Sequence, residues 1–176
     1  MRLIAKLTDG KSYVCHHADA TLPKVDLQNV SYSAFSGPHP AGLVGTHIHF
    51  LEPAHAEKTV WHLSYQDVIA IGRLFASGQL PTERIIAVCG PAAPSPALLR
   101  TRLGAFIPDL IGEPSTGVRV ISGDVLSGHT STGSYGFLGR FHHQVTLIPE
   151  GNQREAFGWI IPSVRKFATA NVHLSS

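Results

Sequence analysis

The chain has 176 residues, of which 43% are hydrophobic and only 15% are charged, a composition that predicts a globular protein. Its formal net charge is only +2, so the charge pattern argues against a nucleic-acid-binding protein or one that adheres to anionic membranes. No apolar run approaches the ~18 residues of a membrane span, and the first ten residues are too polar for a signal peptide, so we expect a cytoplasmic chain.

Residues 12–16 are predicted to form a short strand after a turn at Asp9-Gly10. This strand contains Cys15, and the second cysteine of the chain, Cys89, lies in another apolar run. Neither cysteine belongs to a C-x-x-C pair. The sequence therefore predicts two buried free thiols in a reducing compartment and no disulfide framework.

A glycine-rich loop over residues 37–45 leads into the alternating sequence Thr46–Leu51. The alternation predicts a strand that carries His47 and His49 on one face. Such a pair could supply two ligands to zinc or iron, but no Cys, Asp or Glu stands at a typical spacing to complete the site. We therefore favour polar packing and hydrogen bonding beside the loop, and expect no metal.

Two glycine-rich stretches have the spacing of a phosphate-binding P-loop, but neither carries its chemistry. Residues 37–42 are followed by Leu43 and Val44 where lysine and a hydroxyl residue are needed, and two prolines remove amide donors. Residues 123–130 place a histidine at the lysine position. No nucleophile elbow or carboxylate pair is present either, so the sequence predicts no catalytic residues.

A helix is predicted after Ser64, which has the properties of an N-cap residue with Asp67 in the first turn. Gly78 supplies the stop. One stripe of this helix consists of apolar and small residues: Tyr65, Val68, Ile69, Gly72, Phe75 and Ala76. Glycine inside a helix lowers helix propensity, so we expect close backbone packing at Gly72.

A second unit is predicted to begin near Thr82. Its expected elements are strands at 85–89, 97–101, 118–123 and 141–148, a short helix at 105–110 broken by Pro108, a polar loop at 127–134 and a closing segment at 157–160. This order of strands with one short helix predicts a small α+β barrel or roll, such as a β-grasp fold.

Motifs between Gly37 and Trp159 carry a family resemblance that covers most of residues 10–167. They are Gly37–Phe50 (GPHPAGLVGTHIHF), Val60-Trp61, Tyr65–Gly72, Leu74-Phe75, Glu83-Arg84, Arg100-Thr101, Leu103–Ala105, Ser122-Gly123, Val125–Gly128, Leu138–His142 and Phe157–Trp159. In these motifs the sequence resembles the A subunit of the sodium-translocating NADH:quinone reductases. The resemblance implies an internal fragment with three parts: the end of a Rossmann-like central α/β domain at 1–81, a soluble-ligand-binding β-grasp domain at 82–163, and a tail at 164–176.

The resemblance also implies a function. The A subunit is a cofactor-free peripheral component of a complex that couples ubiquinone reduction by NADH to sodium export, and it docks on membrane subunits on the cytoplasmic face of the inner membrane. More distant relatives of the central domain hold FMN and NADH with a glycine-rich loop that contains a carboxylate. The corresponding loop here, 37–45, has prolines and no carboxylate, so we expect no bound cofactor and no turnover by this chain alone.

The resemblance makes ubiquinone a possible ligand, and one segment has suitable side chains for it. His39, His47 or His49 could donate hydrogen bonds to quinone carbonyls, and Phe50 or Trp61 could form a wall. The alternative is that these residues pack the two domains together. A different function, a stand-alone β-grasp module that binds a small molecule, also remains open.

Overall fold

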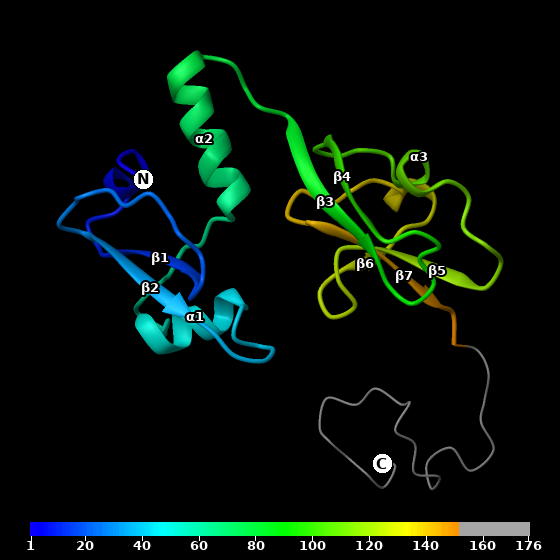
Figure 1. The fold of residues 1–176 in the computed structure, drawn as a ribbon, viewed down its shortest axis with the longest axis horizontal. Helices are drawn as coiled ribbons and strands as arrows, with labels where there is room; N and C mark the ends of the chain where they lie inside the picture. The colour runs from blue at the N-terminus through cyan, green and yellow to red at the C-terminus, as the bar shows by residue number, and fades with distance from the viewer. Residues whose placement is uncertain (152–176) are drawn as a thin grey trace, which may run out of the picture. The chain divides into compact units, whose positions relative to one another are not determined.

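The computed structural model describes residues 1–151. It divides the chain into two compact units, Met1–Pro81 and Thr82–Ser176, whose elements are labelled in Figure 1. The predicted closing segment at 157–160, including Trp159, and the predicted tail at 164–176 lie outside the described residues.

Unit 1 is built on two parallel strands, β1 (Ser12–His17) and β2 (Val30–Phe35), preceded by a short 3-10 helix, η1 (Ile4–Lys6). The strands pair from Ser12 opposite Val30 to His17 opposite Phe35. The predicted first strand is confirmed. The second strand lies outside the predicted elements, because its two serines dilute the apolar signal that identifies a strand.

The segment after the glycine-rich loop forms a helix, α1 (Val44–Leu51), and the predicted strand at Thr46–Leu51 is wrong. Val44, Ile48 and Leu51 have helical spacing, so this short segment contains both periods, and periodicity alone cannot distinguish them. In a helix, residues two apart lie on nearly opposite sides of the axis. His47 and His49 therefore do not share a face.

The second helix, α2 (Tyr65–Ser77), confirms the predicted capping. The Ser64 Oγ accepts a hydrogen bond from the Asp67 amide at 3.1 Å, and Gly78 ends the helix in the left-handed conformation, with φ of 71°. The expected close packing at Gly72 is wrong, because a β-carbon built there meets no atom within 4 Å.

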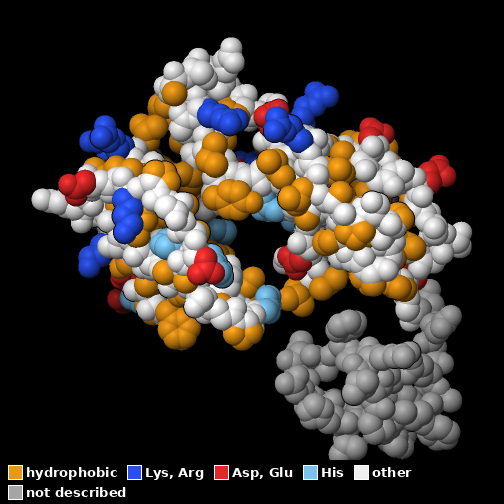
Figure 2. Space-filling view, in the orientation of Figure 1, with side chains coloured by type: hydrophobic (Ala, Val, Ile, Leu, Met, Phe, Trp, Pro, Cys, Tyr) orange, Lys and Arg blue, Asp and Glu red, His pale blue; other side chains and the backbone are white. Residues whose placement is uncertain are grey.

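Unit 1 buries little apolar surface. Among residues 1–81, Ala5 is the only buried hydrophobic residue. The apolar stripe of α2 is exposed, with Tyr65 at 73%, Ile69 at 53% and Phe75 at 68% of their full accessibility, and Figure 2 shows many hydrophobic side chains at the molecular surface. Parallel strands are normally covered on both faces, so unit 1 has the elements of an α/β domain without the layers that complete it.

Unit 2 contains a mixed five-stranded sheet in the order β4-β3-β7-β5-β6. Its elements are β3 (Glu83–Cys89), β4 (Ala97–Arg102), α3 (Ile107–Ile111), β5 (Val118–Ser122), β6 (His129–Thr130), the 3-10 helix η2 (Gly133–Tyr135) and β7 (Gln144–Pro149). Strand β7 runs parallel to β3 and antiparallel to β5. One helix and a mixed sheet make this an α+β unit of the β-grasp kind.

The predicted strands at 85–89, 97–101 and 118–123 are confirmed with small changes at their ends. Pro108 lies in the first turn of α3, where proline is tolerated, so it does not break the helix. Strand β7 begins only at Gln144. His142 and His143, which the predicted strand at 141–148 includes, precede it.

The core of unit 2 lies on one face of this sheet. Its buried hydrophobic members are Ile86, Val88, Ile107, Val120, Leu138, Val145 and Leu147. The register places Val88 opposite Val145 and Val120 opposite Leu147, so three strands contribute side chains to the same layer.

Candidate functional site

Four of the five residues that the sequence singled out between the glycine-rich loop and Trp61 lie at the surface, and the fifth, His47, is half-buried. His39, His49, Phe50 and Trp61 are exposed, the last two at 72% and 88% of full accessibility. The His49 and Phe50 rings meet edge to face, with centroids 5.2 Å apart. The half-buried His47 ring lies against Phe35 instead.

His47 packs inside unit 1. Its ring lies 4.2 Å from the ring centroid of Phe35 on β2, and its Nε2 lies 2.9 Å from the carbonyl oxygen of Ala41. Since a carbonyl can only accept, Nε2 carries the proton and donates it. This contact holds the glycine-rich loop beside β2, in the packing role that was one of the two interpretations of these histidines.

A polar cluster joins the end of α1 to β1. The Tyr13 hydroxyl donates to Glu52 Oε2 at 2.7 Å, and Lys58 forms an ion pair with the other carboxylate oxygen. The bond to Glu52 raises the pKa of Tyr13, and the bonds from Lys58 and then Tyr13 lower the pKa of Glu52. The cluster has a structural role. Sequence reasoning missed it because Tyr13 and Glu52 lie 39 residues apart in the chain.

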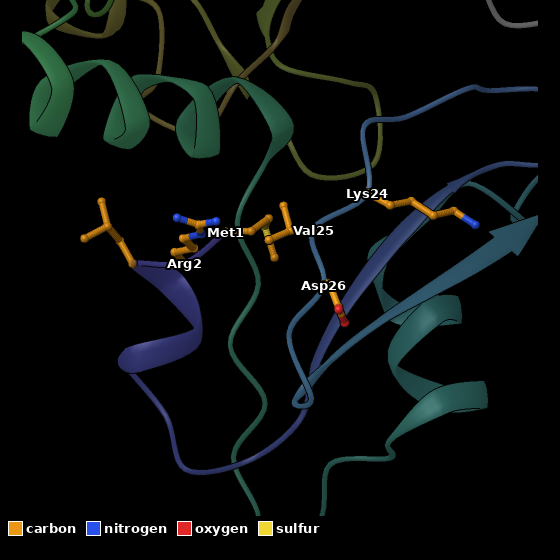
Figure 3. A pocket seen from close by; sticks show the side chains of 6 residues that line it. Met1, Arg2, Lys24, Val25 and Asp26 are labelled. Atoms are coloured by element: carbon orange, nitrogen blue, oxygen red, sulfur yellow. The ribbon is translucent and has the colours of Figure 1, made fainter.

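Unit 1 also has an open pocket of about 540 Å³, shown in Figure 3. Its lining consists of Met1, Arg2, Leu3, Lys24, Val25 and Asp26. The basic and acidic side chains come from the start of the chain and from the connection between β1 and β2. The lining contains none of the candidate residues from the sequence.

A second histidine site lies in unit 2, around Ser122 and His142. Ser122 ends β5 with no exposed surface, and its Oγ lies 2.8 Å from His142 Nδ1. The same oxygen accepts a hydrogen bond from the Gly139 amide at 3.0 Å. The serine thereby links β5 to the turn that precedes β7.

Two glycines enclose the His142 ring. A β-carbon at Gly123 would stand 3.1 Å from the ring atoms Cδ2 and Nε2, and one at Gly139 would stand 2.4 Å from Nδ1. Any larger residue at either position would displace the ring. In the sequence these glycines stand out only as members of the motifs Ser122-Gly123 and Leu138–His142, and their role beside His142 depends on contacts that sequence patterns do not show.

The exposed side of His142 meets other polar and aromatic groups. The His129 ring of β6 lies 5.2 Å from it between centroids, and Tyr135 of η2 lies 6.0 Å beyond His129. Burial, and then the neighbouring His129, lower the pKa of His142, while Asp124 raises it to a smaller extent. The net direction is downward, so His142 is neutral at pH 7.

The chemistry of these groups limits what the site can do. Ser122 is fully buried, so its hydroxyl is out of reach as a nucleophile despite the adjacent histidine. Across residues 1–151, no group of three or more His, Cys, Asp or Glu side chains is placed to hold a metal ion. In the same part of the chain, no helix is both long and apolar enough to span a membrane.

Comparison with protein families assigns both units. The family model described as "NqrA second alpha/beta domain" matches residues 1–80, and the model described as "NQRA C-terminal domain", of the SLBB type, matches residues 85–133. The curated relatives cover the chain more completely. The A subunit of the Na(+)-translocating NADH-quinone reductase from Serratia proteamaculans is 54% identical over 176 residues, which are 99% of this chain and 39% of the relative.

The chain belongs to the NqrA family. The corresponding protein of Yersinia pestis is 51% identical over 176 residues, and that of Histophilus somni is 48% identical over 181 residues. These alignments cover 99% and 100% of this chain, but only 39% and 41% of the relatives. The chain thus spans about two fifths of the length of the NqrA relatives it matches and corresponds to a fragment of them, with the predicted α/β and β-grasp fold classes.

Proposed function

We propose that this chain works as part of the NqrA component of a Na⁺-translocating NADH:quinone reductase, a complex that couples ubiquinone reduction by NADH to sodium export. The observation that carries the proposal is the identity of about one residue in two with NqrA from Serratia proteamaculans, Yersinia pestis and Histophilus somni. The similarity extends over both units and not only over one motif.

Within that complex, we assign the chain a cofactor-free role at the quinone-reducing end or in assembly. It would meet the membrane subunits on the cytoplasmic face. The loop at 37–45 supports this role, since its prolines remove amide donors and it has no carboxylate to hold a nucleotide. The exposed apolar residues of α2 support it too, because such surfaces are typical of contacts with other polypeptide segments.

A segment exchange tests this function. Residues 1–176 replace the matched segment in NqrA of the Serratia proteamaculans reductase, and the complex is purified from cells. We expect the chimeric NqrA to stay with the complex and Na⁺-dependent NADH:ubiquinone reductase activity to be retained. The unaltered complex and one lacking the segment are the controls. A chimera that folds but behaves like the deletion would contradict the proposal.

We also propose a ubiquinone contact at the exposed part of the segment predicted from the sequence, formed by His39, His49, Phe50 and Trp61. His47 would support it only indirectly, because its Nε2–H is bonded to Ala41. An NMR titration of the labelled chain with ubiquinone-1 tests this contact, with saturable shifts expected at His49 and Trp61. A ligand that bound unit 2 while the chimera was inactive would instead favour a stand-alone β-grasp binding module.

A further inference from the structure

The position of one proton is determined by the contacts around Ser122. Its Oγ accepts the Gly139 amide hydrogen, and the hydroxyl has one proton of its own to donate. Within the described residues, the only other polar contact of this oxygen is His142 Nδ1, at 2.8 Å. The hydroxyl therefore donates to Nδ1, and the neutral His142 ring carries its hydrogen on Nε2.

This Nε2–H is a hydrogen-bond donor with a fixed direction, and no acceptor in the described part of the chain takes a hydrogen bond from it. Gly123 and Gly139 hold the ring from two sides, so it cannot turn the donor inward. The side chain is half-buried. Among residues 1–151, the buried side-chain nitrogen and oxygen atoms that lack a hydrogen-bond partner do not include its Nε2. Nε2 therefore reaches solvent and donates outward.

The surrounding groups select the kind of ligand. A metal ion needs a ring nitrogen with a lone pair, but Nδ1 accepts from Ser122 and Nε2 carries hydrogen. An anion would meet the carboxylate of Asp124, which influences His142 electrostatically. A neutral carbonyl oxygen fits a neutral N–H donor better than either.

The neighbouring rings favour a flat molecule. His129 and Tyr135 are exposed, with the His129 ring 5.2 Å from His142 and the Tyr135 ring 6.0 Å from His129. Aromatic faces and edges of this kind stack on planar rings at similar separations. The site thus combines one directed donor with an aromatic surface beside it.

We propose that His142 Nε2–H, with the rings of His129 and Tyr135 beside it, binds a carbonyl oxygen of a planar neutral ligand of the quinone class. The choice of a quinone rests on the proposed function, since the relatives are named as quinone reductases. The site itself rests on the Ser122–His142–Gly139 geometry, and it is distinct from the His49–Phe50 segment.

The test is an NMR titration of ¹⁵N-histidine-labelled chain with ubiquinone-1, preceded by spectra of the free chain that report which ring nitrogens carry hydrogen. We expect Nε2 protonation at His142 before ligand is added, followed by saturable shifts at His142 and His129. The matched control ligand is the dimethyl ether of ubiquinol-1, which keeps the ring and tail but replaces both carbonyls with methoxy groups. We expect it to bind at least tenfold more weakly.

Three variants make the outcome specific. His142→Gln should abolish the shifts at His129, whereas His55→Gln, at an exposed histidine of unit 1, should leave them unchanged. Ser122→Ala should shift the proton toward Nδ1 and weaken binding, with folding checked from the backbone spectrum. Protonation at Nδ1 in the free chain, equal binding of the ether, or shifts confined to His49 and Trp61 would each overturn the proposal. The last result would leave the proposed function intact, because it places the quinone in unit 1.

Discussion

Gly90 lies so close to Leu147 that a β-carbon at position 90 would stand 2.2 Å from the Leu147 carbonyl oxygen. Gly90 follows the end of β3, and its φ of 107° is also unfavourable for any residue with a side chain. The Ala92 amide donates to the same Leu147 oxygen at 3.1 Å. This turn therefore closes directly over β7, the central strand of the sheet.

Gly90→Ala should destabilise unit 2 strongly. Two costs combine, steric overlap with the Leu147 backbone and a disfavoured φ, and together we expect a loss of about 3 kcal/mol or more in the free energy of unfolding. Denaturant unfolding followed by the amide signals of β3 and β7 measures it. A loss below about 1 kcal/mol would show that the turn can move away from β7.

Gly72→Ala should change stability in the opposite direction and stabilise the chain. The position lies inside α2, and a β-carbon there meets no atom within 4 Å. Replacing an unstrained helical glycine should stabilise the helix by about 0.5–1 kcal/mol. Thermal unfolding followed by circular dichroism measures the change. Destabilisation would indicate that another polypeptide segment packs against Gly72 and needs the space.

The stability of unit 2 should decrease as the pH is lowered below 6.5, the ordinary pKa of histidine. Since His142 has a lowered pKa in the folded state, the unfolded chain binds more protons as the pH falls, and the free energy of unfolding decreases until the pH passes the folded-state value. His129 and Asp124 are the charged or titratable groups that act on it. Urea unfolding at pH 8, 7, 6 and 5 should show this decline, and His142→Gln should flatten it.

Glu52→Gln should lower the pKa of Tyr13. The hydrogen bond to Glu52, together with its negative charge, stabilises the protonated phenol in the parent chain. Without the charge, Tyr13 should ionise at lower pH, which an NMR titration of the tyrosine ring carbons resolves. Tyr32 serves as an internal reference because its hydroxyl contacts backbone groups instead. An unchanged pKa of Tyr13 would mean that the Tyr13–Glu52 hydrogen bond does not form in solution.

Helix α2 and the strands β3, β4, β5 and β7 were predictable because local chemistry and periodicity agree there, whereas the two-residue strand β6 lies in the predicted polar loop. Ser64 and Gly78 mark the ends of α2 by side-chain capping and by a left-handed residue. Helix α1 was not predictable, because the apolar residues of Thr46–Leu51 fit a strand period of two as well as a helical period. The error mattered for function, since it placed His47 and His49 side by side.

The site in unit 2 could not be predicted in the same way. Ser122, His129, Gly139 and His142 come from different elements, and only the fold brings them together. The sequence did contain one usable signal, the motif Leu138–His142, which places a glycine three residues before a histidine. That spacing acquires meaning only once the turn preceding β7 is known.

The scarcity of buried side chains in unit 1 affects how its stability should be measured. With Ala5 as the only buried hydrophobic residue among residues 1–81, the unit gains little from its own packing and would depend on whatever covers α2 and the strand pair. Folding and association then form a single equilibrium governed by mass action. The midpoint of its unfolding should consequently rise with the concentration of the covering segment, whereas that of unit 2 should not.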